Sequence, residues 1–130
     1  MSNRSFDWLR QAIEDLKHAK LSFEAADYDW ACFASQQAAE KASKALHLFF
    51  NQQAFGHSVF KLLKELPIEV PKDLLEKAKI LDSYYIAARY PNGFPEGSPY
   101  EFFGEIQAKG AIEYASQIVE FARFQMARQR

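Results

Sequence analysis

The chain has 130 residues, of which 48% are hydrophobic and 15% aromatic, and its formal net charge is −1. This length fits a single domain over residues 1–130 that buries a core without disulfides, and the hydrophobic content excludes a disordered chain. The small net charge argues against an extended nucleic-acid-binding surface, although it is compatible with a local basic pocket.

The single cysteine, Cys32, lies in an apolar run and has no partner for an internal disulfide. A small buried hydrophobic residue is a more common role for such a cysteine than a nucleophile. No apolar run approaches the roughly 18 residues of a membrane helix. The N-terminal sequence also lacks the apolar core of a signal peptide. We therefore expect a cytoplasmic protein that does not insert into a membrane.

Apolar residues three and four positions apart predict an amphipathic helix over residues 5–25, with Ser5 as its N-cap. The short turn that follows predicts that the next helix runs antiparallel to the first. This second helix is expected over residues 29–52. It has a stripe of small side chains that lets a neighbouring helix approach closely. The stripe consists of Ala31, Ala34, Ala38, Ala42 and Ala45.

A second, polar stripe on the same helix has two interpretations. Glu40 precedes Lys44 by four residues, which is the favourable orientation for a helical ion pair. The stripe is either a solvated helix face or the edge of a polar site formed with Gln37 and Lys41. The helix alone favours the solvated face.

Ser58 is expected to cap a short helix over residues 59–66, which Pro67 ends. His57 comes directly before that helix, where it either bonds backbone groups of the turn or contacts a ligand phosphate. The proline at position 71 predicts the start of a fourth helix that runs to about Arg89.

Residues 90–100 contain three of the five prolines and two of the five glycines. A loop of this length in a small bundle is more often functional than a simple connection. The last helix is expected to begin near Tyr100 or Glu101, and Gly110 within it predicts a close contact with another helix. Arginines in the C-terminal tail suit the negative end of its dipole; they are Arg123, Arg128 and Arg130.

No segment has the alternating pattern of a strand, and no internal repeat is present. Four long helices and one short helix predict an all-α, antiparallel up-and-down bundle. The high aromatic content favours a covered subunit interface, for which a symmetric homodimer is the simplest arrangement.

The sequence lacks the glycine-rich phosphate-binding loops, the zinc-binding HExxH and paired-cysteine motifs, and the serine hydrolase elbow. Its histidines, His18, His47 and His57, are scattered. We therefore expect no metal site, no cofactor and no catalytic residues.

Polar residues of three segments form the candidate ligand-binding set. Arg89 suits a phosphate or carboxylate, and Tyr90 suits a stacked base. Alternatively, an ion pair of Arg89 with Asp82 or Glu40 would hold the long loop against the bundle. The full set is Gln37, Glu40, Lys41, Lys44, His57, Asp82, Tyr85, Arg89 and Tyr90.

Four blocks, QQAAEKASKAL, GHSVFKLL, LDSYYIAARYPNG and AIEYASQIVEF, resemble the HEPN domain family in this order and cover nearly the whole chain. The resemblance implies a compact helical bundle that usually forms homodimers. It also implies a partnership with a minimal nucleotidyltransferase, often as a two-gene toxin–antitoxin-like pair. HEPN domains further resemble the helical substrate-binding domain of kanamycin nucleotidyltransferase, and some members are metal-independent ribonucleases.

The ribonuclease members carry an arginine followed, after four to six residues, by a histidine. After Arg89 the corresponding positions hold Phe94, Pro95 and Glu96, and no other arginine of the sequence has a histidine at that spacing. Without this imidazole, acid–base chemistry on a 2′-hydroxyl lacks a proton carrier. The sequence therefore disfavours a ribonuclease toxin.

We expect a non-catalytic HEPN protein that binds a nucleotide or another phosphorylated ligand and acts with a separate minimal nucleotidyltransferase. Lys41, Lys44 and Arg89 are expected to bind phosphate and Tyr90 to stack, while Glu40 and His57 orient the ligand. A purely structural dimerisation module, a residual ribonuclease and an accessory toxin or antitoxin are the alternatives.

Overall fold

The computed structural model describes residues 3–128, in which α-helices account for nearly all regular structure and no strand occurs. The helices are α1 (Ser5–Glu24), α2 (Tyr28–Phe49), α3 (Val59–Lys64), α4 (Lys72–Asp82), α5 (Tyr84–Ala87), α6 (Pro99–Phe102) and α7 (Glu105–Arg128), with a 3-10 helix η1 (Pro91–Gly93) between α5 and α6. The predicted all-α bundle is confirmed.

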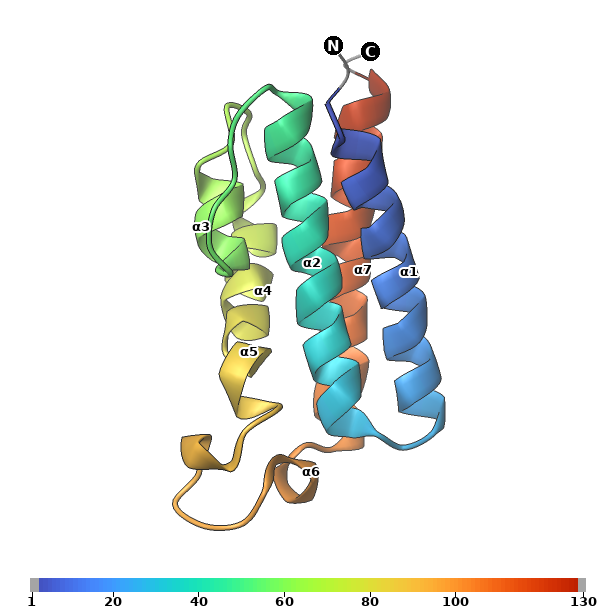
Figure 1. Ribbon diagram of the computed structural model, residues 1–130, viewed down its shortest axis with the longest axis vertical. Coiled ribbons are helices and arrows are strands. Elements are labelled where there is room, and N and C mark those ends of the chain that lie inside the picture. The colour runs from blue at the N-terminus through green and yellow to red at the C-terminus, as the bar shows by residue number, and fades with distance from the viewer. Residues whose placement is uncertain (1–2, 129–130) are drawn as a thin grey trace.

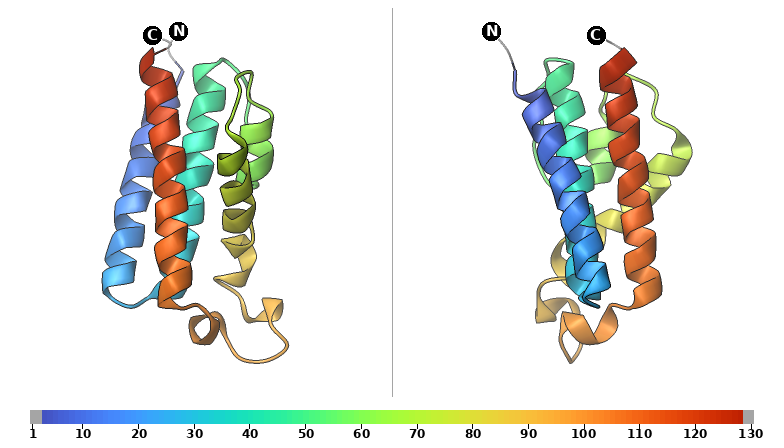
Figure 2. Two further views of the ribbon diagram at one scale, coloured as in Figure 1. Left: turned by 180° about the vertical axis from the view of Figure 1, so that it is seen from behind. Right: turned by 90° about the vertical axis from the view of Figure 1, so that its right-hand side faces the viewer.

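Helix α2 is the centre of the bundle. The long helices α1 and α7 lie beside it, and α3, α4 and α5 pack on its other flank (Figure 1). The views from behind and from the side show the same arrangement, with η1 and α6 at one end of the long helices (Figure 2). Helix α2 contacts each of the other α-helices, so residues on its different faces can meet side chains from every part of the fold.

Small side chains line the contacts between the three long helices. The alanine stripe predicted on α2 is buried, and both α1 and α7 contribute buried alanines to the same core. Since each alanine adds a single carbon to the backbone, the helix axes can lie close together. Buried leucines of α3 and α4, with Ile118 and Met126 of α7, complete the core.

The structure corrects two of the predicted helix ends and confirms one cap. Ser5 lies inside α1 rather than capping it, and Asn3 supplies the oxygen that accepts from the Ser5 N–H at 3.1 Å. Helix α2 ends at Phe49, because Asn51 has a φ of 60°, which no helix residue adopts. Ser58 caps α3 as predicted, and its hydroxyl accepts from the Lys61 N–H at 3.1 Å.

The single helix predicted up to Arg89 is two helices, α4 and α5, separated at Ser83. The Ser83 hydroxyl donates to the Ile80 carbonyl at 2.6 Å, and the Ser83 N–H donates to the same oxygen at 3.1 Å. Such bonds compete with regular helical pairing and bend the chain. Consequently Arg89 follows the short helix α5 instead of ending a long one.

The final helix also begins later than predicted. Residues 99–102 form the separate helix α6, and α7 begins at Glu105. Between them, Phe103 is extended and buried, with its ring 5.6 Å from that of Tyr84. Burial of this ring against α5 explains why the helix does not run through it.

Two expectations for α7 have different outcomes. The structure does not support the close helix contact predicted at Gly110, because the three atoms nearest to a Cβ placed there all belong to Tyr114 of the same helix, at 3.8 Å. Arg123 pairs with Glu120 and Arg128 ends the helix, while Arg130 lies outside the described residues. No helix within residues 3–128 is both long and apolar enough to cross a bilayer.

Candidate functional site

Arg89 is surrounded by aromatic rings from three segments. Its guanidinium carbon lies 4.3 Å from the ring centroid of Phe33 on α2, 4.6 Å from that of Tyr85 on α5 and 5.0 Å from that of Tyr90. Its Nε donates to the Tyr85 carbonyl at 2.8 Å, which fixes the side chain against its own turn. These four residues are called the Arg89 cluster below.

Arg89 forms no ion pair with any residue that the structure describes. The alternative of a structural ion pair with Asp82 or Glu40 is therefore wrong. The outer nitrogens of the half-buried guanidinium have no hydrogen-bond partner among residues 3–128 either. A planar cation in this state retains the N–H edge that binds a phosphate or a carboxylate.

Glu40 is the centre of a second polar group on the neighbouring part of α2. It is 5% exposed and accepts from Lys44 Nζ at 3.0 Å and from Gln36 Nε2 at 3.1 Å. His57 Nδ1 lies 3.2 Å from both of its carboxylate oxygens. Since a buried carboxylate is costly without such partners, these bonds explain how Glu40 is accommodated.

His57 connects the two groups. Its ring stacks on that of Tyr85, with centroids 4.5 Å apart and an interplanar angle of 16°. Its backbone carbonyl accepts from Gln36 Nε2 at 3.1 Å, which fixes the segment before α3 against α2. Side-chain contacts therefore connect Lys44 to Arg89 without a gap, through Glu40, His57 and Tyr85.

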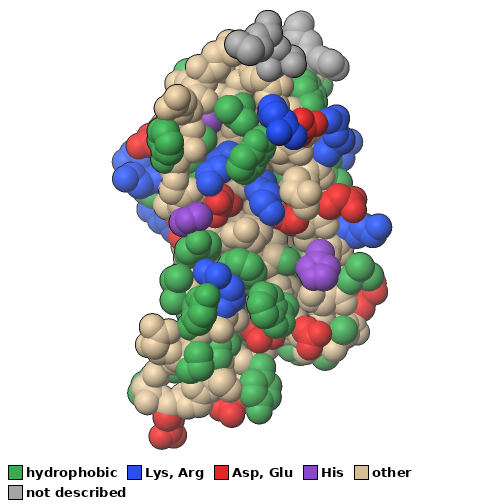
Figure 3. Space-filling view, viewed as in Figure 1, with side chains coloured by type: hydrophobic (Ala, Val, Ile, Leu, Met, Phe, Trp, Pro, Cys, Tyr) green, Lys and Arg blue, Asp and Glu red, His purple; other side chains and the backbone are tan. Residues whose placement is uncertain are grey.

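The space-filling view shows this face of the molecule. Basic side chains and a histidine border acidic side chains over α2, and a basic side chain is surrounded by hydrophobic ones where Figure 1 places α5 (Figure 3). The structure thus brings together six residues of the predicted set: Glu40, Lys44, His57, Tyr85, Arg89 and Tyr90. Gln37 lies at the edge, and its amide donates to Gln36 at 2.8 Å.

The other two predicted residues are engaged elsewhere. Lys41 points toward α1, and its Nζ donates to Asp15 at 2.5 Å. The Asp82 carboxylate accepts from the N–H groups of Val59 and Phe60, at 2.6 and 3.2 Å, and from the Ser58 hydroxyl at 2.8 Å. A carboxylate at this position satisfies free N–H groups of the first turn of α3, so Asp82 holds α4 to α3.

Phe33 and Gln36 also belong to these two groups, although neither is in the set predicted from the sequence. Both lie on α2 at positions that helical spacing relates to the predicted residues, because Phe33 precedes Gln37 by four residues and Gln36 precedes Glu40 by four. Trp8 of α1 was also missed, and its ring centroid is 5.8 Å from Lys44 Nζ. Only the fold brings Trp8 to this site.

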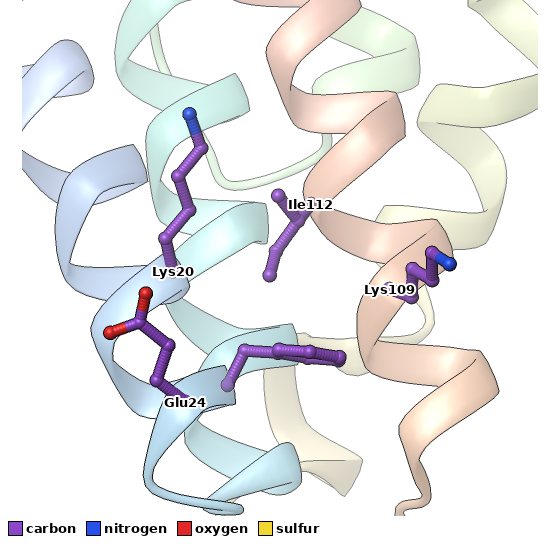
Figure 4. A pocket seen from close by; sticks show the side chains of 5 residues that line it. Lys20, Glu24, Lys109 and Ile112 are labelled. Carbon is purple, nitrogen blue, oxygen red and sulfur yellow. The ribbon is translucent and has the colours of Figure 1, made fainter.

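Two surface hollows are lined in part by residues of these groups. One, of about 390 Å³, has Trp8 and Lys44 in its wall, and another, of about 240 Å³, has Trp30, Phe33 and Gln37. A further hollow of about 260 Å³ lies between α1 and α7, with Lys20, Phe23 and Ile112 in its wall (Figure 4). It shares no residue with the predicted set and is mainly apolar.

Burial determines the state of the single cysteine. Cys32 has no exposed surface, and burial, with a smaller contribution from Asp29, raises the pKa of its thiol to about 12. A thiol in this state is a poor nucleophile. No three metal-binding side chains gather in the part of the chain that the structure describes.

The chain is similar to several solved structures. For the protein TT1696 from Thermus thermophilus, the TM-score is 0.92 and the sequence identity 48%, over 94% of this chain and 98% of that one. For ST0689, an archaeal HEPN homologue, the TM-score is 0.83 and the sequence identity 38%, over 96% of this chain and 99% of that one. For the HEPN domain protein tm0613 from Thermotoga maritima, the TM-score is 0.78 and the sequence identity 39%, over 94% of this chain and 98% of that one.

A comparison with curated proteins gave no match. The family model of the HEPN domain, in contrast, matches residues 6–125, which is nearly the whole chain. Together with the helical bundle and the similarity to HEPN proteins of known structure, this match confirms the resemblance of the four sequence blocks. The chain belongs to the HEPN domain family.

Proposed function

We propose that this HEPN protein binds a nucleotide or a similar phosphorylated ligand at the Arg89 cluster and acts with a separate minimal nucleotidyltransferase. The observation that carries the ligand proposal is the state of Arg89, a guanidinium without a carboxylate partner in the described chain, held between three aromatic rings. Arginine binds phosphate through two parallel N–H bonds, and aromatic rings stack on bases.

The surroundings give each neighbouring residue a different role. The charge of Lys44 is largely balanced by Glu40, and that of Lys41 by Asp15, so Arg89 is the main phosphate-binding residue in this proposal. The side chain of His57 is 56% exposed. When Nδ1–H donates to Glu40, the Nε2 of a neutral imidazole is an acceptor, which suits a ligand hydroxyl such as that of a ribose.

The proposed role is non-catalytic. The sequence has no histidine at the ribonuclease spacing after Arg89. His57, which reaches the same site from another segment, uses Nδ1 to hold Glu40. Cleavage of RNA without added metal by the purified protein, lost in Arg89→Ala, would contradict this part of the proposal and favour the ribonuclease alternative.

Calorimetric titration with ATP and the other nucleoside triphosphates tests the binding site. We expect saturable binding that Arg89→Ala weakens by more than about 1.4 kcal/mol, a tenfold loss. Arg89→Lys keeps the charge but loses the planar edge, so it should restore only part of the affinity. Arg123→Ala is the matched control, because this exposed arginine lies on α7 and pairs with Glu120.

The opposite result is equally clear. If none of the nucleotides binds at about 1 mM to wild-type protein with the expected helical spectrum, the ligand proposal is wrong. A purely structural module would then be favoured, and Arg89→Ala would retain both fold and partner binding.

The partner proposal has its own test. A reading frame next to the gene should encode a small protein with a nucleotidyltransferase signature, and the two proteins should purify together after co-expression. We also propose a homodimer, as the high aromatic content suggested, and light scattering of the eluting protein measures its mass. A monomeric mass at all concentrations would refute the dimer, and separate elution of the two proteins would refute the pairing.

A further inference from the structure

Three large apolar side chains are exposed at the end of the bundle where α6 and the first turn of α7 lie. Ile106 is 91% exposed, Tyr100 71% and Phe102 46%. Single exposed apolar residues are ordinary, but a group of them bordered by charges is typical of a surface that contacts another molecule. This end of the molecule is therefore a candidate interaction surface.

The loop that carries this apolar group is fixed to the core by ring contacts. The ring of Phe102 stacks on that of Phe94, with centroids 4.7 Å apart. The Phe94 ring also lies 6.4 Å from that of Phe103, which is buried against Tyr84. The exposed side chains are thus anchored before any partner arrives, and binding needs little further ordering of the loop.

The charged residues in the same part of the chain are all acidic. Residues 90–108 contain no lysine or arginine, and the nearest lysine, Lys109, borders the hollow between α1 and α7 (Figure 4). The acidic residues are Glu96, Glu101 and Glu105; all three are exposed, and none forms an ion pair within residues 3–128. The three apolar and three acidic residues are called the α6 surface below.

The surroundings add to this negative charge. The turn between α1 and α2 lies at the same end of the bundle and contributes Asp27 and Asp29 (Figures 1 and 2). Asp29 and Glu105 lie in the first turns of α2 and α7, where a carboxylate suits the positive end of a helix dipole. That role does not explain Glu96, which lies in the loop, or the exposure of Ile106. The space-filling view shows acidic and hydrophobic side chains, and no basic one, over the segment that Figure 1 labels α6 (Figure 3).

The arrangement of these charges decides between possible ligands. No three metal-binding side chains gather within residues 3–128, so the carboxylates are too far apart to hold one metal ion. They suit several separate cations instead. Nucleic acids and anionic membranes carry the same sign of charge as this surface and are repelled by it. A basic polypeptide is attracted, and its own apolar side chains can cover the exposed rings.

We propose that the α6 surface binds a segment of another protein that carries lysine or arginine beside large apolar side chains. The apolar side chains of the segment cover Tyr100, Phe102 and Ile106, while its cations pair with the glutamates. Complementary charge of this kind speeds association and excludes acidic partners. The proposal does not depend on the nucleotide or on the nucleotidyltransferase.

Nuclear magnetic resonance of the full-length, 15N-labelled protein tests this proposal with a synthetic helical peptide that has leucine on one face and lysine on the other. The titration is made at about 0.15 M salt, which screens attraction between distant charges. We expect saturable shifts of the backbone signals of residues 96–106 at up to about 1 mM peptide. Two altered peptides, with glutamate in place of lysine or serine in place of leucine, should each bind at least about tenfold more weakly.

Two substitutions in the protein each remove one of the attractions. Ile106→Ser removes an apolar contact and Glu96→Lys reverses a charge, and each should weaken binding of the leucine–lysine peptide by at least about tenfold. Both side chains are exposed, so the substitutions leave the core intact. The matched controls, Phe124→Ser and Glu113→Lys, change exposed residues farther along α7 and should bind as the wild type does.

Several results would overturn the proposal. One is that the leucine–lysine peptide shifts none of these signals, and another is that both substitutions leave its binding unchanged. Equal binding of either altered peptide would show that charge alone or apolar contact alone is responsible. The same shifts on concentrating the protein without peptide would identify a second copy of this chain as the occupant. None of these results affects the nucleotide proposal, because the α6 surface shares no residue with the Arg89 cluster.

Discussion

Replacing Glu40 by alanine should destabilise the fold more than any exposed ion pair can. The change removes the carboxylate that Lys44, Gln36 and His57 contact. The side chains of Glu40 and Lys44 are 6% and 13% exposed, so the ammonium would be left without a counter-charge and largely without water. Removing one partner of a buried pair costs about 3–5 kcal/mol.

We expect Glu40→Ala to lower the free energy of unfolding by about 3 kcal/mol, the lower end of that range. The reason is that the flexible stem of Lys44 lets its ammonium move toward solvent. For a chain of this length, such a loss lowers the melting temperature by about 10 °C. Since domains are stable by about 5–15 kcal/mol, the variant should still fold at room temperature.

Urea unfolding followed by circular dichroism measures this loss in the single variants Glu40→Ala and Lys44→Met and in the double variant. The double variant should be more stable than Glu40→Ala alone, because it no longer contains the stranded ammonium. Glu76→Ala is the control, since its pair with Lys79 is 57% and 52% exposed and, screened by solvent, should contribute little to stability. Equal losses in Glu40→Ala and Glu76→Ala would refute this account of the buried group.

Three further outcomes follow from particular contacts. Asp82→Ala should cost about 1–2 kcal/mol and speed hydrogen exchange across α3, because the first turn loses its acceptor; unchanged exchange would contradict the capping role. Since the pKa of Cys32 is raised from 9.0 to about 12, stability should fall as pH rises above 9.0. Between about pH 8 and about pH 10, urea unfolding should show a total loss of about 1.4 kcal/mol in the wild type but not in Cys32→Ala, because only the pH unit above 9.0 contributes fully. Gly97→Ala should cost about 1–2 kcal/mol, measured by thermal unfolding, because φ there is 82° and the added Cβ would lie 2.5 Å from an oxygen of Glu101. Gly104→Ala, where a Cβ meets nothing within 4 Å, should be nearly neutral.

The sequence predicted the features that depend on helical spacing. The buried alanine stripe of α2 and the ion pair between Glu40 and Lys44 follow from residues three and four positions apart on one helix, and both are present. Tyr85 and Arg89 of the predicted set are four residues apart, and they lie together because the break at Ser83 comes before both.

Features that depend on partners distant in sequence could not be predicted. Lys41 and Lys44 lie on the same helix, but Asp15 of α1 engages the first and Glu40 the second. The role of Asp82 depends on how α4 meets the first turn of α3, and spacing along the chain contains no information on this. The break at Ser83 depends on a hydroxyl that bonds a carbonyl rather than water.

The alanine-lined contacts between α1, α2 and α7 also have a thermodynamic consequence. An alanine side chain has no rotamers to lose, so ordering these three helices costs little side-chain conformational entropy. Arg89 and Lys44, in contrast, have many rotamers and lie outside these alanine-lined contacts, so ordering their side chains costs more entropy. A ligand of the Arg89 cluster would bind with a favourable enthalpy that is partly offset by this ordering, while the three long helices stay as they are.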